Sequence, residues 1–295
     1  MSPHDILPPD PAAVNRIVAA ALAEDAPWGD LTSTLLVPDG TRTAATVTAR
    51  EPGVFCGGQV IEAAFRLVSA GTAVTLSVAD GETFEAGAVL ARIDGDARAV
   101  LTAERVALNL AQRLSGIATL TAAFVEQVRG TKARITDTRK TTPGLRVLER
   151  HAVRCGGGFN HRFSLSDAVM AKDNHLALLG TGDELSAALR RAKSRLPHTA
   201  HFEVEVDRLD QIEAVLAGGA DTVLLDNFEL PDLRRGVELV AGRALTEASG
   251  NVRLETVAAI AATGVDLISA GALTHSVRAL DLGLDLVLHP AGVSR

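Results

Sequence analysis

The sequence predicts an α/β protein in which a parallel β/α barrel, closed or nearly closed, follows a smaller N-terminal unit. Three observations lead to this fold class. Beyond residue 131, short apolar runs alternate with segments of helical period. Each apolar run ends in polar residues, as expected when all the strand ends surround one site; an open, doubly wound sheet would place them mainly at one switch point. Residues 41–98 instead alternate short β-branched runs with glycine-containing turns.

The chain begins with signals for a helix and a small β unit. Asp10 and Pro11 have the form of an N-cap followed by a first-turn proline, and the apolar residues after them predict a helix that ends near Pro27. Residues 41–98 then form the small, mostly β unit.

A long helix is predicted from residue 99 to residue 115. It carries apolar residues on two opposite sides, with Arg105 on the second side. Such a helix is typical of a segment lodged between two domains or two subunits, although an exposed Arg105 paired with Glu104 fits the periodicity equally well. Ser115 and Gly116 predict a break before another helix over residues 117–128.

Six strands alternating with helices are predicted beyond residue 131, and a seventh is a candidate near Gly156. Their polar ends are at residues 137–140, 172–173, 205–207, 226–227, 247–251 and 269–271. We therefore expect an N-terminal domain over residues 1–115 and a catalytic barrel over residues 116–277, with residues 278–295 packing back on the first domain.

Composition narrows the possible partners. The 295 residues carry a net charge of −7, which argues against nucleic acids and anionic membranes as partners, because both attract a basic surface. Aromatic residues make up only 3 % and tyrosine is absent, so the core must be built mainly from Ala, Val and Leu. Small molecules are the expected partners.

The two cysteines, Cys56 and Cys155, lie far apart in the sequence, and their spacing indicates neither a disulfide scaffold nor a zinc site. The N-terminus has no basic and apolar leader pattern, and no later segment approaches the ~18 apolar residues of a membrane span. We therefore expect a cytoplasmic protein.

Residues 136–175 form a basic segment in an acidic chain. They hold seven Lys or Arg against four Asp or Glu, and two of the four lysines of the chain, Lys140 and Lys172. A local positive field of this kind attracts small anions, and mixed Arg and Lys suit both carboxylate and phosphate geometry. A solvated loop without a ligand is the alternative.

The predicted strand ends bring two kinds of charge together. The cations are Arg139, Lys140, His161, Arg162 and Lys172. The acids are Glu205 and Asp226, on neighbouring strands. Acids beside cations fit a sugar phosphate with a divalent ion, since Mg²⁺ prefers one or two carboxylates plus phosphate oxygens. Acids that only hold neighbouring loops are the alternative.

The last two strand-to-helix loops contain small residues and glycine. They are formed by Ser249, Gly250 and Asn251 and by Ala270, Gly271 and Ala272. Loops at the last strands of a barrel commonly bind phosphate through backbone N–H groups. The three glycines at 156–158 are no P-loop, because no Gly-Lys-Ser/Thr follows them.

Several motifs, in order and spacing, resemble one enzyme family. They are TDTRKTTPGLR, GGGFNHR, AKDNH, EVEVD, LLDN, EASGN and GVDLISAGALTHS, with EDAPWGDLTS and ERVALNLAQRLSGIAT upstream. Together they resemble nicotinate-nucleotide pyrophosphorylase (carboxylating), also called quinolinate phosphoribosyltransferase, over nearly the whole chain. The resemblance implies an N-terminal α/β sandwich-like domain joined to an incomplete, open β/α barrel.

The resemblance also implies the reaction and its residues. Quinolinate and 5-phosphoribosyl pyrophosphate give nicotinate mononucleotide, pyrophosphate and CO₂ in de novo NAD biosynthesis, with Mg²⁺ and a homodimer or an assembly of dimers. Quinolinate is held by Arg139, His161, Arg162 and Lys172, with Thr138 beside them and Arg105 from a partner subunit. Lys140, Glu205 and Asp226 are the catalytic residues: Lys140 contacts pyrophosphate, and the two acids contact ribose and metal, directly or through water. The 5′-phosphate lies against Ser249, Gly250, Asn251, Ala270, Gly271 and Ala272.

Two alternatives and one departure accompany the resemblance. A paralogous phosphoribosyltransferase of the molybdate-operon type, acting on another ring acid, should lose part of the set that binds two carboxylates. A binding protein without activity should lose Glu205 or Asp226, and both are present. Ser164 stands where the family usually has glycine, which predicts a different turn near Arg162.

Overall fold

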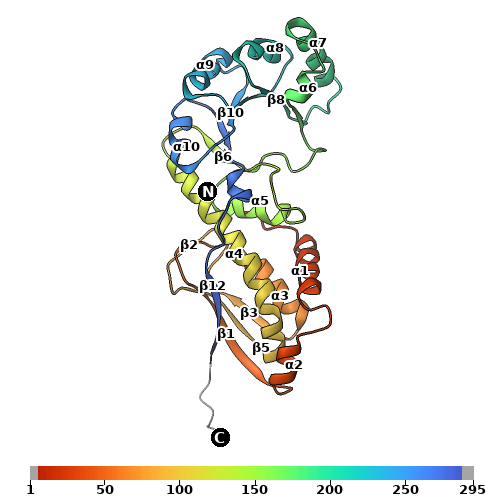
Figure 1. Cartoon of the computed structure of the whole chain (residues 1–295), viewed down its shortest axis with the longest axis vertical. Coiled ribbons are helices and arrows are strands. Elements are labelled where there is room, and N and C mark those ends of the chain that lie inside the picture. The colour runs from red at the N-terminus through yellow and green to blue at the C-terminus, as the bar shows by residue number, and fades with distance from the viewer. Residues whose placement is uncertain (1–5, 288–295) are drawn as a thin grey trace. The chain divides into compact units, whose positions relative to one another are not determined.

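The computed structural model describes residues 6–287, which form two compact units (Figure 1). Within the described chain, the first unit comprises residues 6–120, 142–157 and 277–287, and the second comprises residues 121–141 and 158–276. Among the described residues, no helix combines the length and the apolar content that a membrane crossing needs.

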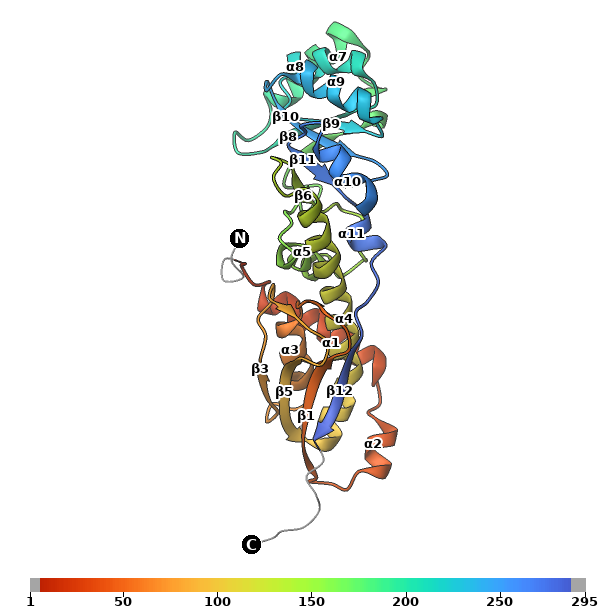
Figure 2. The same cartoon turned by 90° about the vertical axis from the view of Figure 1, so that its left-hand side faces the viewer.

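The first unit is built on an antiparallel sheet. Its strands are β1 (Arg42–Ala49), β2 (Gly53–Val54), β3 (Ala73–Leu76), β4 (Thr83–Phe84), β5 (Val89–Asp96) and β12 (Leu282–Val287). The main sheet has the order β12-β1-β5-β3, and β2 pairs with β4. In Figure 2 the C-terminal strand β12 runs beside β1, with Leu284 opposite Val47. The predicted return of residues 278–295 to this unit is seen for the part up to residue 287, and the remainder lies outside the described residues.

Five helices complete the first unit. They are α1 (Pro11–Asp25), α2 (Leu31–Leu36), α3 (Gly58–Val68), most of α4 (Ala97–Gln127) and α5 (Arg146–Cys155). The N-terminal helix begins as predicted: Asp10 accepts a hydrogen bond from the backbone N–H of Ala12 at 3.0 Å, and Pro11 occupies the first turn. The core contains Ile61 and Phe65 of α3, which are fully buried.

The predicted break at Ser115 and Gly116 is wrong, because α4 runs unbroken from Ala97 to Gln127. A Cβ atom on Gly116 would lie 2.2 Å from the carbonyl oxygen of Arg278. Glycine therefore serves here for a close backbone approach rather than for a helix end. The same helix buries Ala103, whereas the Arg105 side chain is 59 % exposed.

The second unit is a parallel sheet with helices between its strands. Its strands are β6 (Arg134–Thr136), β7 (Val169–Ala171), β8 (Phe202–Val206), β9 (Thr222–Asp226), β10 (Leu245–Ser249) and β11 (Leu267–Ser269). Its helices are the end of α4, α6 (Asp173–Leu176), α7 (Gly182–Lys193), η2 (Leu209–Gln211), α8 (Ile212–Ala217), α9 (Leu230–Val240), α10 (Leu254–Ala261) and α11 (Ala272–His275). The six predicted strands are all present.

The barrel is incomplete. The strand order is β6-β11-β10-β9-β8-β7, so β6 and β7 are the two edges and do not pair with each other. The alternating pattern predicted a barrel that is closed or nearly closed; the barrel is not closed, and the open form implied by the family resemblance is confirmed. No seventh strand forms at Gly156, which caps the C-terminus of α5, and only one isolated parallel bridge, Thr136 to Phe159, extends the described sheet beyond β6.

Candidate active site

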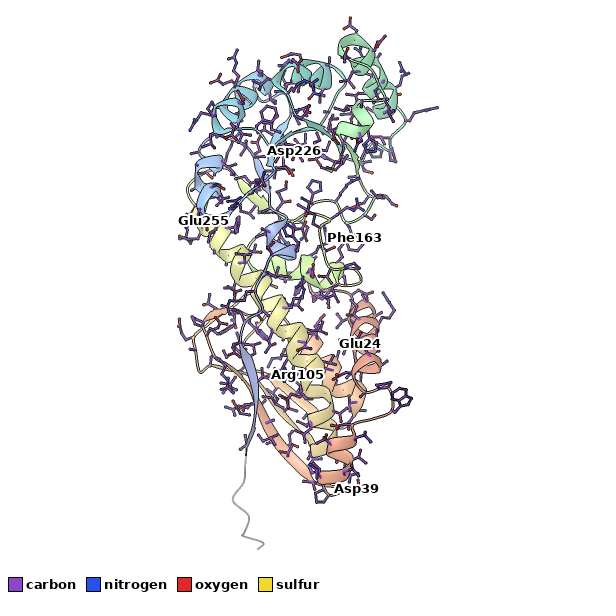
Figure 3. All side chains as sticks on the ribbon, viewed as in Figure 1. Glu24, Asp39, Arg105, Phe163, Asp226 and Glu255 are labelled. Carbon is purple, nitrogen blue, oxygen red and sulfur yellow. The ribbon has the colours of Figure 1, made fainter. Side chains whose placement is uncertain are left out.

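The carboxyl ends of the parallel strands carry the predicted site residues to one edge of the second unit. The register places Ser249 beside Asp226, and Ser269 beside Thr136. Figure 3 labels Asp226 at the end of β9. We name these residues the strand-end site: residues 137–140, 161–162, 172, 205, 226, 249–251 and 270–272. Because strands of one parallel sheet end at the same edge, the strand order brings the residues that follow these strands to that edge. His161 and Arg162 follow no strand of the sheet and come after the isolated bridge at Phe159.

Asp137, directly after β6, anchors the segment that carries His161 and Arg162. Its side chain is fully buried. One carboxylate oxygen accepts from the Asn160 side chain at 2.6 Å, and the other accepts from the backbone N–H of His161 at 2.7 Å. The backbone N–H of Phe159 donates to the carbonyl oxygen of Ile135 in β6, and the carbonyl oxygen of Phe159 accepts from the backbone N–H of Asp137. A buried carboxylate that accepts two such bonds fixes the direction of the next side chains.

His161 points at two buried glutamates. Its Nε2 atom lies 3.0 Å from Oε2 of Glu203 and 3.5 Å from Oε1 of Glu247. Burial lowers the pKa of His161, but the hydrogen bond to Glu203 and the charges of Glu247, Glu203 and Asp137 together raise it above its ordinary value. The three side chains therefore form a polar cluster in which the imidazole is held by carboxylates on strands β8 and β10.

The two glutamates of this cluster cannot both be ionised without a large cost. Burial, followed by the negative charge of Glu203, raises the pKa of Glu247 to about 8. Oε1 of each residue is buried and accepts no hydrogen bond within the described residues. Two buried carboxyls facing one imidazole are best satisfied when one of them holds a proton.

Two guanidinium groups of the second unit, those of Arg139 and Arg162, interact electrostatically. Burial and the positive charge of Arg139 lower the pKa of Arg162. Arg162 donates from Nη1 to the carbonyl oxygen of Ala168 at 3.1 Å, and Nε of Arg139 is buried without a hydrogen-bond partner among the described residues. Neighbouring cations repel each other, so an anion with two carboxylates would relieve the repulsion and satisfy the open donors.

Lys172 and Glu205 form an ion pair across β7 and β8. The Lys172 side chain is 46 % exposed, whereas that of Glu205 is only 9 % exposed. The family resemblance implies that these two residues contact different parts of the substrates. The structure brings them into direct contact, so Lys172 is also the group that neutralises a largely buried acid.

The loop after β10 contacts the residue that follows β9, and both segments contain residues with positive φ angles. Asn227 and Asn251 have positive φ angles of 58° and 50°, and Gly250 has a φ of 93°. The Asn227 side chain donates to Asp226 at 2.7 Å and accepts from Asn251 at 3.2 Å. Residues held in this sparsely populated region concentrate at functional sites. The predicted phosphate loop thus contacts Asn227, and Asn227 in turn orients the carboxylate of Asp226.

Gly250→Ala is expected to destabilise the second unit clearly more than Gly242→Ala does. A Cβ on Gly250 would lie 2.2 Å from Oδ1 of Asn227, whereas a Cβ on Gly242 would meet nothing within 4 Å. Both positions have positive φ, 93° and 72°, so the backbone strain is matched and the difference reports the clash. We expect a difference of ~1–3 kcal/mol in the free energy of unfolding, measured by urea denaturation. Equal losses in the two variants would contradict a tightly packed loop.

The other predicted phosphate loop packs against Lys140. The Thr274 hydroxyl donates to the carbonyl oxygen of Lys140 at 2.8 Å, and a Cβ on Gly271 would lie 2.9 Å from the Lys140 side chain. The Thr138 hydroxyl accepts from the backbone N–H of Lys140 at 3.1 Å. Residues 138–140 and 270–272 thus form one continuous surface at the ends of β6 and β11.

Arg105 differs from the other predicted site residues. It belongs to the first unit, on α4, where Figure 3 labels it, and its nearest recorded acid is Glu104 at 3.9 Å. The remaining predicted residues all belong to the second unit. Ser164, the departure from the family pattern, has no positive φ, and its backbone N–H donates to Asp167 at 2.8 Å.

The structure gives a role in the site to five residues for which no such role was predicted, although three of them belong to the predicted polar strand ends. The five are Asp137, Asn160, Glu203, Asn227 and Glu247. A signal was present for Glu203, since the alternation in EVEV places it on the same face of the strand as Glu205. The positive φ of Asn227 left no signal beyond the residue type, which tolerates that region.

Comparison with known proteins decides the family. Residues 30–115 match the model of the quinolinate phosphoribosyl transferase N-terminal domain, and residues 117–285 match that of the C-terminal domain. The chain belongs to the quinolinate phosphoribosyltransferase family. It is 45 % identical over 280 residues to nicotinate-nucleotide pyrophosphorylase [carboxylating] of Mycobacterium leprae, covering 93 % of this chain and 97 % of that one. A probable nicotinate-nucleotide pyrophosphorylase [carboxylating] of Bacillus subtilis is 42 % identical over 265 residues, covering 90 % of each chain.

Solved structures of this family have the same fold. The nicotinate-nucleotide pyrophosphorylase of Francisella tularensis superposes with a TM-score of 0.89 at 38 % identity, covering 96 % of this chain and 99 % of that one. The protein of that name from Ehrlichia chaffeensis gives a TM-score of 0.87 at 36 % identity, covering 92 % and 98 %. The two-unit architecture with an open barrel is therefore the architecture of the quinolinate phosphoribosyltransferase family.

Proposed function

We propose that this chain transfers the phosphoribosyl group of 5-phosphoribosyl pyrophosphate to the ring nitrogen of quinolinate. The products are nicotinate mononucleotide, pyrophosphate and CO₂, and the reaction serves de novo NAD biosynthesis. The observation that carries the proposal is the set of cations that follow the parallel strands, Arg139, Lys140 and Lys172, at the same sheet edge as Glu205 and Asp226. That edge offers cations for a dicarboxylate beside acids for a ribose.

Substrate orientation is the main task of the basic residues. Arg139, Arg162 and Lys172 supply the donors for two ring carboxylates, and His161 is held in place by Glu203. Bidentate guanidinium–carboxylate pairs fix both distance and angle. Holding the ring nitrogen against the ribose carbon turns a bimolecular step into an effectively unimolecular one.

The acids and Lys140 act on the charges that develop. When the bond to pyrophosphate breaks, positive charge grows on the ribose, and the carboxylates of Glu205 and Asp226 stabilise it. Lys140 stabilises the negative charge on the leaving pyrophosphate. Once the ring nitrogen is alkylated, the pyridinium cation stabilises the carbanion left by loss of CO₂, so the ring itself supplies what a further organic cofactor would.

Mg²⁺ fits the donor set of this site. Glu205 and Asp226 are hard oxygen ligands on adjacent strands, and Mg²⁺ is commonly held by one or two carboxylates together with substrate phosphates. When bound, the ion would neutralise charge on the pyrophosphate. A homodimer that shares its active sites, with Arg105 supplied by the second subunit, and a cytoplasmic location complete the proposal.

Purified protein with Mg²⁺ and 5-phosphoribosyl pyrophosphate is expected to convert quinolinate to nicotinate mononucleotide and to release CO₂. Nicotinate should not substitute, because the site is built for two carboxylates. Product formation is followed by chromatography and by trapping of labelled CO₂. Turnover of a monocarboxylate without turnover of quinolinate would reject the proposal in favour of a paralogous phosphoribosyltransferase of the molybdate-operon type, which no observation here favours.

A further inference from the structure

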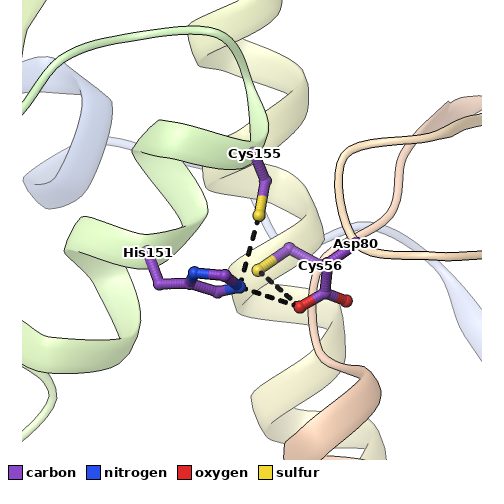
Figure 4. Close-up of side chains that lie close together, drawn as sticks. All are labelled: Cys56, Asp80, His151 and Cys155. Atoms are coloured by element: carbon purple, nitrogen blue, oxygen red, sulfur yellow. Dashed lines mark hydrogen bonds and ion pairs between the residues drawn. The ribbon is translucent and has the colours of Figure 1, made fainter. Parts of the chain in front are cut away.

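A second cluster of reactive side chains lies in the first unit, apart from the residues assigned to the reaction. Cys56, Asp80, His151 and Cys155 gather there, as Figure 4 shows. Cys56 precedes α3 and Asp80 lies in the turn between β3 and β4, whereas the other two residues are on α5. Residues four apart on a helix share a face, so α5 presents His151 and Cys155 together. The sequence spacing of the two cysteines gave no sign of this arrangement.

The four ligand atoms have the separations of a tetrahedral metal site. All of them lie within 4.8 Å of one another. Nε2 of His151 is 2.9 Å from Oδ2 of Asp80 and 3.4 Å from Sγ of Cys155, and Sγ of Cys56 is 4.0 Å from Oδ2 of Asp80. Zinc bonds of about 2.0 Å to N or O and about 2.3 Å to S imply ligand-to-ligand separations of about 3.3–3.8 Å. Changes of these separations by no more than about 1 Å would therefore bring the four atoms to zinc geometry.

The surrounding backbone holds two of the ligands in position. Oδ1 of Asp80 accepts from the backbone N–H groups of Gly57 and Gly58 at 2.9 and 3.0 Å, which leaves Oδ2 to face the cluster. The hydroxyl of Ser115 accepts from the N–H of Cys56 at 3.1 Å and donates to its carbonyl oxygen at 3.0 Å. Such outer hydrogen bonds orient metal ligands and tune their affinity.

Burial and donor type select the ion. Both cysteines are buried, and the side chains of His151 and Asp80 are 8 % and 20 % exposed. Two sulfurs, one imidazole and one carboxylate suit Zn²⁺, whereas Mg²⁺ prefers oxygen ligands throughout. Four protein ligands leave no open position, which is typical of a structural rather than a catalytic zinc.

We propose that Cys56, Asp80, His151 and Cys155 bind one structural Zn²⁺ ion in the first unit. The ion joins α5 to the loop before α3 and to the turn after β3, three segments that are distant in the sequence. Binding displaces the thiol protons and links the stability of this unit to the metal. The proposal is independent of the proposed reaction, since none of the four residues belongs to the strand-end site.

The test uses the full chain, stripped of metal by a chelator under reducing conditions and then titrated with Zn²⁺ against a chromophoric competitor. We expect one equivalent of tightly bound Zn²⁺ and a higher melting temperature with it. Loading the stripped protein with Co²⁺ instead should give the absorption of tetrahedral cobalt with a sulfur-to-cobalt charge-transfer band. This spectrum requires no variant and reports thiolate ligation directly.

Variants locate the site. Cys155→Ser and Asp80→Asn should each weaken Zn²⁺ binding by more than about 100-fold, the upper end of what the loss of an outer partner costs. His198→Ala, at an exposed histidine of the second unit, should bind like the parent chain. Folding of each variant is checked by circular dichroism, and Asp80→Asn retains an oxygen for the Gly57 and Gly58 contacts.

Three outcomes would overturn the proposal. The first is a parent chain that binds no Zn²⁺ and gives no cobalt–sulfur band, which would make the cluster a hydrogen-bonded packing contact. The second is Zn²⁺ binding that survives Cys155→Ser unchanged. The third is a disulfide between Cys56 and Cys155, found by mass spectrometry in the freshly purified protein, with no recovery of Zn²⁺ binding after reduction.

Discussion

Arg139→Ala and Arg105→Ala should each lower kcat/KM for quinolinate by about 100-fold or more, and mixing the two variants should restore activity. Removing one partner of a charge-assisted contact to a substrate carboxylate typically costs ~2–5 kcal/mol, and each 1.4 kcal/mol is about tenfold. Arg139 lies beside Arg162 in the second unit, whereas Arg105 is largely exposed on α4 of the first. An exposed arginine on a helix with two faces can serve a second subunit.

The mixing experiment separates the two positions. In a mixed dimer, one of the two shared sites combines an intact Arg139 with an intact Arg105 of the partner subunit. Random exchange of subunits should therefore recover about one quarter of wild-type activity. Arg139→Ala mixed with Arg162→Ala is the matched control, because both residues come from the same subunit and no intact site can form.

Two results would count against shared sites. One is an Arg105→Ala and Arg139→Ala mixture that forms heterodimers, seen by native mass spectrometry, but stays inactive. The other is an Arg105→Ala variant with unchanged kcat/KM. The first result would reject the sharing of sites between subunits, and the second would reject a role of Arg105 in the reaction.

Glu247→Gln should remove much of the pH dependence of stability between pH 4.5 and 8. Glu247 has a pKa of about 8 in the folded chain against 4.5 as its ordinary value. Below pH 4.5 the carboxyl is protonated whether the chain is folded or unfolded. As the pH rises toward 8, the unfolded chain ionises while the folded chain keeps the proton, so the stability of the parent chain falls.

The expected size follows from the shift. One pKa unit corresponds to about 1.4 kcal/mol. The Glu247 carboxyl therefore lowers the free energy of unfolding of the parent chain by up to a few kcal/mol at pH 8 relative to pH 4.5. Because glutamine does not titrate, the difference in free energy of unfolding between variant and parent should rise in favour of the variant over this window. Urea denaturation at several pH values measures it.

A matched control isolates the buried carboxyl. Glu255→Gln removes an exposed acid of the same unit, on α10, and should leave the pH profile of the parent chain nearly unchanged. If Glu247→Gln follows the same profile as the parent, the raised pKa of Glu247 is contradicted.

Local patterns predicted most of the elements because they depend on nearby residues. The six parallel strands, the capped N-terminal helix and the strand-end position of the acids were all read from periodicity and turn signals. Gly116 was misread because the reason for a glycine there is the Arg278 carbonyl, which arrives from far along the chain. Whether the barrel is closed or only nearly closed stayed undecided because the alternating pattern does not show whether the two edge strands pair.

The site was predicted where it coincides with strand ends and missed where it depends on the barrel interior. Glu205 and Asp226 were found because polar residues after apolar runs are visible in the sequence. Glu203 was missed, and Glu247 was predicted only as part of a polar strand end, because only the imidazole of His161 explains buried carboxyls at these two positions. Asp137 was not recognised as an anchor because its partners follow 23 and 24 residues later.

The sequence by itself determined the family, the order of the elements and the charged residues of the strand ends, since these follow from local periodicity and from motifs. Only the tertiary structure decided which side chains meet. It left the barrel open between β6 and β7, paired Lys172 with Glu205, enclosed His161 between two glutamates, and gathered Cys56, Asp80, His151 and Cys155. The physical reason is that contacts between distant segments depend on strand order and helix packing, which no local pattern encodes.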